Sequence, residues 1–103
     1  MKKILLVVVG LASALPAFAG PSWLGGTITN ITSAPNGLYI MLDTGVPDNC
    51  VGTPYGWMVI PESARTMVAV TLITRLQNVP VTVYTSGKDA SGYCIINQVD
   101  PAL

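Results

Sequence analysis

ESARTMVAVTLITRLQ, residues 62–77, is the stretch on which the fold of this chain depends. Its sixteen residues contain no glycine or proline, a length that is ordinary for a helix and long for a strand. Glu62 suits a helix start and Asn78 the left-handed residue that ends one. The apolar residues at helical spacing predict a buried stripe: Val68, Ala69, Leu72, Ile73 and Leu76. The many β-branched residues leave a strand as the alternative.

Strands are predicted on both sides of this helix. Three precede it, at 27–32, 38–43 and 55–60, and two follow it, at 81–85 and 93–99. Leu38, Ile40 and Leu42 alternate with more polar neighbours, which is typical of a half-buried strand. The turn sequence at 34–37, APNG, predicts a hairpin between the first two strands, and residues 21–26 are expected to form a leader into the fold.

The first nineteen residues have the layout of a secretory signal peptide. Lys2 and Lys3 are followed by a short apolar run, and Ala17-Phe18-Ala19 supplies a small-x-small cleavage site. The run is shorter than the roughly 20 residues that cross a bilayer, so no membrane span is expected; a retained anchor and a buried helix are the alternatives. We expect cleavage after Ala19, a periplasmic or secreted protein, and one domain over residues 20–103.

Cys50 and Cys94 are the only cysteines of the chain. In an exported domain an even number of cysteines predicts a disulfide, here between these two. Two free, buried thiols are the alternative. The loop over residues 44–54 would then be fixed by the bond.

Composition argues against several classes of function. There is no histidine, so no histidine-based nucleophile system or imidazole base exists, and no zinc site or other cofactor is expected. The acidic residues are scattered at predicted turns, so acid–base catalysis by a carboxylate pair is not favoured. Beyond residue 19 there are three basic and five acidic residues, a net charge of −2, which argues against nucleic-acid binding. We expect no catalytic residue and no metal ligand.

Aromatic side chains are the candidate ligand contacts. Aromatic rings pack on the apolar face of a sugar while their polar tips form hydrogen bonds, and Tyr39, Trp57 and Tyr84 are the candidates. Filling the core is the alternative role for these rings, because no phenylalanine remains after Phe18. Met67 and Val70 lie off the predicted stripe of the helix, on a face with little charge, and are the candidates for an oligomer or partner surface.

The order of three strands, a helix and two strands in a small exported domain resembles the oligonucleotide/oligosaccharide-binding (OB) fold, a five-stranded Greek-key barrel. Residues 38–43, 81–85 and 92–101 are similar to a group of small exported bacterial proteins of unassigned function. More distantly, Gly26-Thr27-Ile28-Thr29, the helix and residues 81–84 are similar to the pentameric B subunits of subtilase-cytotoxin and typhoid-toxin type. We therefore expect a mainly β, OB-like barrel with one helix and one disulfide.

The toxin resemblance implies a ring that binds sialylated glycans on host cells. This chain is shorter, its cysteines fall elsewhere, and the serine and acidic residues of the sugar site have no secure match, so no binding residue is carried over. Two hypotheses follow: an exported, non-enzymatic module that binds a glycan, as a homo-oligomeric ring, or a periplasmic accessory protein that binds another protein.

Overall fold

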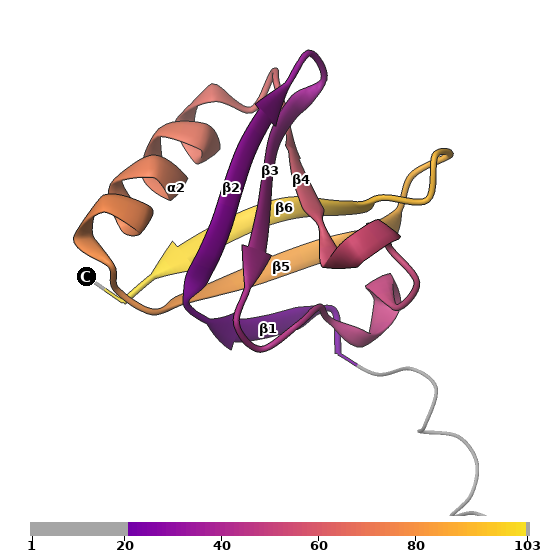
Figure 1. The fold of residues 1–103 in the computed structure, drawn as a ribbon, viewed down its shortest axis with the longest axis horizontal. Helices are drawn as coiled ribbons and strands as arrows, with labels where there is room; N and C mark the ends of the chain where they lie inside the picture. Colours follow the sequence, from indigo (N-terminus) through magenta and orange to yellow (C-terminus); the bar gives the residue numbers. More distant parts are fainter. Residues whose placement is uncertain (1–20, 103) are drawn as a thin grey trace, which may run out of the picture.

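Six strands and one helix follow one another in the computed structural model, which describes residues 21–102 (Figure 1). Two short turns of 3-10 helix, Asp48–Cys50 and Pro54–Gly56, lie between the third and fourth strands. The predicted signal peptide lies outside the described residues. The elements in chain order are β1 (Trp23–Gly26), β2 (Ile28–Ala34), β3 (Gly37–Leu42), β4 (Met58–Pro61), α2 (Arg65–Gln77), β5 (Val81–Lys88) and β6 (Cys94–Pro101).

All six strands belong to one sheet, in the order β1-β5-β6-β4-β3-β2. Neighbouring strands are antiparallel except β4 and β6, which run parallel and pair Met58 with Cys94. The mainly β fold with one helix is confirmed, but the prediction of five strands and a closed barrel is wrong. Within residues 21–102, β1 and β2 are the two edges of the sheet and are not paired with each other. Only Thr27 separates them, and each pairs with a different strand.

The strand that the sequence analysis missed is β1, which had been expected to be a leader. Its two glycines resemble a linker because glycine weakens a strand. In the structure β1 pairs with β5 from Trp23↔Tyr84 to Gly26↔Val81. At Gly26 a Cβ atom would meet the side-chain oxygens of Thr44 and Asp43, which would have to shift to make space for it. The Asp43 carboxylate accepts the Thr27 N–H at 2.9 Å and so holds the bend between β1 and β2.

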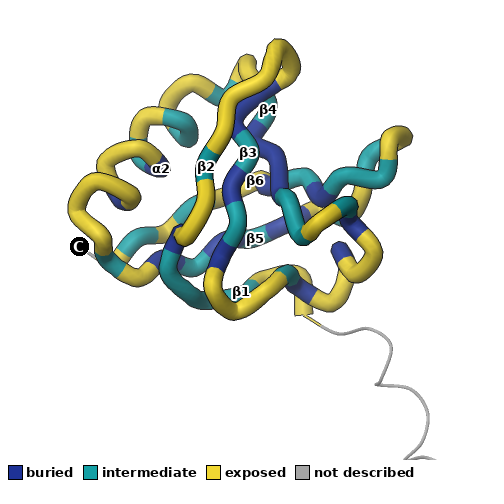
Figure 2. The backbone as a smooth tube through the Cα atoms, in the orientation of Figure 1, coloured by how far each residue is buried: buried dark blue, intermediate teal, exposed yellow. Residues whose placement is uncertain are grey.

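Buried residues lie on both halves of the curved sheet (Figure 2), and their side chains form one core cluster. Leu38, Ile40 and Leu42 point inward from β3, as their alternation predicts. The other half of the sheet contributes Val81, Val83 and Ile96 to the same cluster. One core therefore holds together strands that are far apart in the sheet order.

The predicted hairpin is confirmed, and one strand start is corrected. β2 and β3 pair as far as Ala34↔Gly37, with Pro35 and Asn36 in the turn between them. The third predicted strand begins at Met58 and not at Tyr55. Tyr55 lies in the turn at Pro54–Gly56 with φ 56°, a left-handed conformation that a strand cannot contain.

The predicted helix is confirmed with a later start. α2 begins at Arg65, and the backbone N–H of Glu62 instead donates to the carbonyl of Asn36 at 3.0 Å. Asn78 ends the helix in the left-handed conformation, with φ 54°, as predicted.

The predicted buried stripe of this helix is wrong over most of its length. Thr71 and Thr74 are buried, whereas Leu72, Ile73 and Leu76 are 42%, 50% and 84% exposed. The buried threonine hydroxyls donate at 2.8 Å to the carbonyls of Met67 and Val70, one turn earlier in the helix. Because these hydroxyls are satisfied within the helix, the threonine methyl groups can pack inward like those of valine. Most of α2 is therefore exposed on its outer side (Figure 2).

The predicted disulfide between Cys50 and Cys94 is confirmed. Both residues are fully buried, and the bond joins the 3-10 turn at Asp48–Cys50 to the start of β6. No helix within residues 21–102 has the length and apolar character needed to cross a membrane.

Candidate functional site

Tyr39 and Trp57, two of the three predicted ligand contacts, come together on the outer face of the sheet. Tyr39 is paired with Val59 across β3 and β4, and Trp57 lies two residues before Val59, on the same side of the chain. This diagonal relation brings large side chains into contact. The two ring centroids are 6.4 Å apart and the rings are nearly perpendicular, at 89°.

Tyr93 completes the cluster, although the sequence analysis did not place it in the site. The parallel pairing Met58↔Cys94 sets the residues before them, Trp57 and Tyr93, side by side. Tyr93 meets Tyr39 edge to face, with 5.3 Å between centroids and 81° between planes. Parallel pairing of strands 36 residues apart leaves no signal in sequence alternation, which is why Tyr93 was missed.

A hollow of about 250 Å³ opens among these rings. It is lined by Thr32, Ala34, Tyr39, Trp57 and Tyr93, which we call the aromatic hollow. Thr32 is paired with Tyr39 across β2 and β3 and is exposed at the rim. The Tyr39 hydroxyl accepts a hydrogen bond from the Asn36 side-chain amide at 2.6 Å. None of the lining residues carries a charge.

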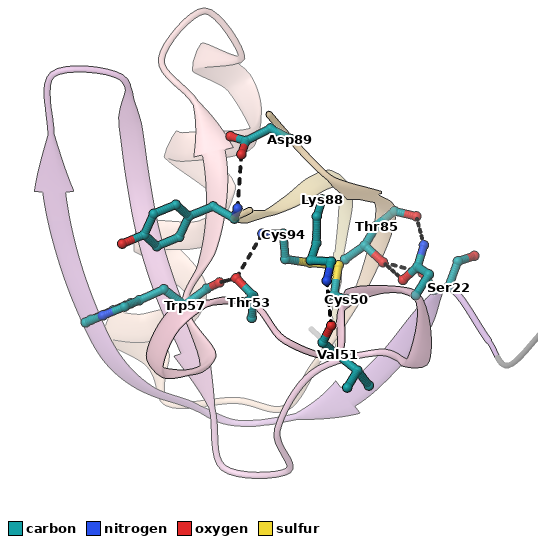
Figure 3. Close-up of a disulfide and its surroundings, with 11 residues drawn as sticks. Ser22, Cys50, Val51, Thr53, Trp57, Thr85, Lys88, Asp89 and Cys94 are labelled. Atoms are coloured by element: carbon teal, nitrogen blue, oxygen red, sulfur yellow. Dashed lines mark hydrogen bonds between the residues drawn. A yellow bond between two sulfur atoms is a disulfide. The ribbon is translucent and has the colours of Figure 1, made fainter. Parts of the chain in front are cut away.

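Hydrogen bonds around the disulfide fix the positions of two of the rings (Figure 3). The buried Thr53 hydroxyl donates to the Trp57 carbonyl at 2.7 Å and accepts the Cys94 N–H at 3.0 Å. The Asp89 carboxylate accepts the Tyr93 N–H at 3.0 Å. In Figure 3 the Trp57 side chain points away from the disulfide. The loop and the start of β6 therefore form one connected support beneath the hollow.

Tyr84, the third predicted contact, lies elsewhere. It is on β5, opposite Trp23 of β1 and Gln98 of β6, and does not line the hollow. The structure therefore brings together two of the three predicted contacts and replaces the third by Tyr93.

Met67 and Val70, the predicted partner face, are both half-buried, and Met67 packs against the core. The exposed apolar side chains of α2 are instead Leu72, Ile73 and Leu76, which we call the α2 outer face. A groove of about 400 Å³ runs between α2 and the β2–β3 hairpin. Its lining includes Leu38, Val68 and Leu72, with Glu62 and Arg65 as its charged members.

The described residues offer no metal centre. Among residues 21–102 no group of three or more acidic, cysteine or histidine side chains comes together as metal ligands would. Every buried side-chain polar atom in this part of the chain has a hydrogen-bond partner. The chemistry available at the aromatic hollow is thus apolar contact and hydrogen bonding by neutral groups.

No protein-family model, curated protein or solved structure matches this chain. The resemblance to small exported proteins and to toxin B subunits therefore stays a prediction.

Proposed function

We propose that this protein is an exported, non-enzymatic binding module that binds a glycan through the aromatic hollow. The observation that carries the proposal is the convergence of Tyr39, Trp57 and Tyr93 around one hollow on the surface. Aromatic faces with polar tips are the groups that pack on sugar rings, and a concave site with few polar groups is typical of a ligand pocket.

Export is supported by the N-terminal sequence and by the disulfide. Residues 1–19 have the pattern of a signal peptide. The Cys50–Cys94 bond is compatible with the periplasm or the cell exterior, where disulfides persist.

The order of the elements supports an OB-like arrangement of strands and helix, in which the sheet stays open between β1 and β2. The two sheet edges, β1 and β2, are consecutive in the chain, so the backbone itself joins them. The helix lies between β4 and β5, as the helix of an OB fold lies between its third and fourth strands.

The α2 outer face and the distribution of charge support a homo-oligomeric ring like that of toxin B subunits. Both arginines of the chain, Arg65 and Arg75, lie on α2, whereas all five acidic residues lie outside it. We expect the basic helix of one copy to meet acidic residues of the next. Head-to-tail contacts of this kind form a ring when the rotation between successive copies closes.

Glycan binding is tested on an array with the oxidised, processed protein. We expect binding to a defined subset of glycans and its loss in the Trp57→Ala variant, with Tyr55→Ala as the matched control because Tyr55 is 86% exposed and outside the hollow. An array with no bound glycan, together with no contact between the protein and any of these glycans by saturation-transfer NMR in solution, would contradict the proposal.

The ring is tested by size-exclusion chromatography with light scattering. We expect an oligomer that dissociates when Leu72 and Leu76 are both changed to glutamine. A monomer with the mass of the processed chain would rule out the ring and leave the glycan proposal standing.

A second candidate function is that of an accessory protein that binds another exported protein. The α2 outer face, with the groove beside it, is the observation in its favour, because monomeric proteins rarely leave such a face uncovered. Cross-linking in the native periplasm tests it: a stoichiometric protein partner that disappears in the Leu72→Gln, Leu76→Gln double variant favours this function over the ring.

A further inference from the structure

The chemistry of the aromatic hollow narrows the class of ligand. Resting on the proposed glycan-binding function, we propose that the hollow holds an uncharged hexopyranose unit rather than a sialic acid. The neutral lining, the size of the hollow and its hydrogen-bonding groups each carry part of the argument.

No basic side chain among residues 21–102 lines the hollow, which argues against an acidic sugar. The lining residues are all neutral. Lys88 donates its ammonium to the Val51 carbonyl at 2.8 Å, and Arg65 lines the separate groove beside α2. The charged group that is hydrogen-bonded to the cluster is an anion: the Asp89 carboxylate accepts the Tyr93 N–H. A bound carboxylate would lose water without gaining a positive partner, which is costly.

The size and shape of the hollow fit a single sugar ring. Its volume of about 250 Å³ lies below the roughly 300–1,000 Å³ of pockets for drug-sized ligands. Tyr39 stands nearly perpendicular to both Trp57 and Tyr93, so the rings form corners and do not cover each other by stacking. A pyranose can place its face of C–H groups on one ring and its edge against another.

Neutral hydrogen-bonding groups surround the hollow. The Tyr39 hydroxyl already accepts from Asn36, so its own proton is free to donate to a ligand. The Tyr93 hydroxyl, the Thr32 hydroxyl and the Trp57 indole N–H add both donors and acceptors. Sugar hydroxyls both donate and accept, and they match this set without any net charge.

Saturation-transfer NMR on the oxidised, processed protein tests the inference, because one sugar ring of about a dozen heavy atoms is expected to bind only in roughly the millimolar range. The probes are uncharged oligosaccharides ending in galactose, glucose, mannose or N-acetylglucosamine, and the same oligosaccharides capped with sialic acid. We expect contact with at least one uncharged probe and weaker or no contact once that probe is capped.

Three variants locate the binding. Trp57→Ala should weaken it about tenfold or more, and Trp57→Phe, which keeps an aromatic ring and the fold, should weaken it several-fold. Tyr55→Ala should leave it unchanged. Selective binding of sialylated probes, or neutral binding that both Trp57 variants retain, overturns the inference while glycan binding itself stands. Failure of every probe, and of the glycan array, overturns both the inference and the proposed function.

Discussion

At the residue scale, threonine fills buried positions that the sequence pattern does not predict. The buried polar residues in the described part of the chain are all threonines: Thr53, Thr71, Thr74 and Thr85. Each has a β-branched body that packs like valine and a hydroxyl that donates to an oxygen nearby. The small core thus contains polar side chains, and every one of them has a hydrogen-bond partner. This matters because a buried polar group without a partner costs about 1–3 kcal/mol.

Thr53 should be the most sensitive of these threonines because its hydroxyl bridges two segments. Thr53→Val keeps the shape but leaves the buried Cys94 N–H without its acceptor and the Trp57 carbonyl without its donor. We expect the free energy of unfolding to fall by about 1–3 kcal/mol. Urea denaturation measures it, with Thr29→Val as the control, since Thr29 is exposed and its contact to Met41 is long, at 3.5 Å. Equal stability of the two variants would contradict the bridging role.

Gly37 has no space for a side chain. An added Cβ would collide with the carbonyl oxygen of Ile60, which belongs to the backbone of β4 and cannot turn away. We expect Gly37→Ala to lower the free energy of unfolding by about 1–3 kcal/mol. In the strand β1, Gly25→Ala meets only Thr82 at 3.6 Å, an ordinary contact, and should be neutral or stabilising by up to about 1 kcal/mol. Thermal denaturation compares them, and a neutral Gly37→Ala variant would disprove the clash.

At the scale of elements, α2 exposes most of the apolar stripe that the sequence predicts to be buried. Its leucine and isoleucine side chains are exposed, and its inward face combines Met67 and Val68 with the two threonines. Thr71 and Thr74 are fully buried, as are Ile40 and Met58 of the sheet. Leu72, Ile73 and Leu76 are left at the surface.

This orientation predicts a reversed pattern of sensitivity along the helix. Leu76→Gln should change the free energy of unfolding of the monomer by less than about 0.5 kcal/mol, because Leu76 is 84% exposed and both residues favour helix. Met67→Gln should cost about 1–2 kcal/mol, because Met67 packs on the core. Urea denaturation at low protein concentration separates the two effects from assembly. A larger loss of unfolding free energy for Leu76→Gln than for Met67→Gln would contradict the orientation of α2 in the structure and favour the one that the sequence predicts.

Local patterns predicted the elements well, and contacts between distant elements account for what was missed. The alternation at Leu38–Leu42, the turn before Gly37 and the stop at Asn78 are written in neighbouring residues, and each is confirmed. The face of α2 depends on the space left by the sheet, and Tyr93 enters the site through a parallel pairing of β4 with β6. No stretch of sequence carries either kind of information by itself. Tyr39 and Trp57 were identified by residue type, and their contact depends on the register of β3 and β4.

At the scale of the whole molecule, the disulfide connects the support of the aromatic hollow to the sheet. Cys50 lies in a loop with little regular structure, whereas Cys94 begins β6, which pairs with both β4 and β5. Lys88 reinforces the link, because its ammonium donates to the carbonyl of Val51 next to Cys50. The loop over residues 44–57 thus gains its order from contacts with the far end of the chain.

Loss of the disulfide should therefore affect both stability and the hollow. Closing a loop of 44 residues is worth about 4 kcal/mol in the chain-entropy model, a large share of the roughly 5–15 kcal/mol that stabilises a small domain. We expect the Cys50→Ala, Cys94→Ala double variant to lose about 3–5 kcal/mol in urea denaturation. In a Trp23→Phe background, which leaves Trp57 as the only tryptophan, we expect the Trp57 fluorescence to shift toward that of exposed indole before the global transition. Oxidised protein measured with and without reductant is the control. A reduced protein with an unchanged midpoint and an unchanged Trp57 signal would contradict this prediction. The hydrogen bonds of Thr53 to Trp57 and Cys94 would then be enough, without the disulfide, to keep Trp57 beside Tyr93.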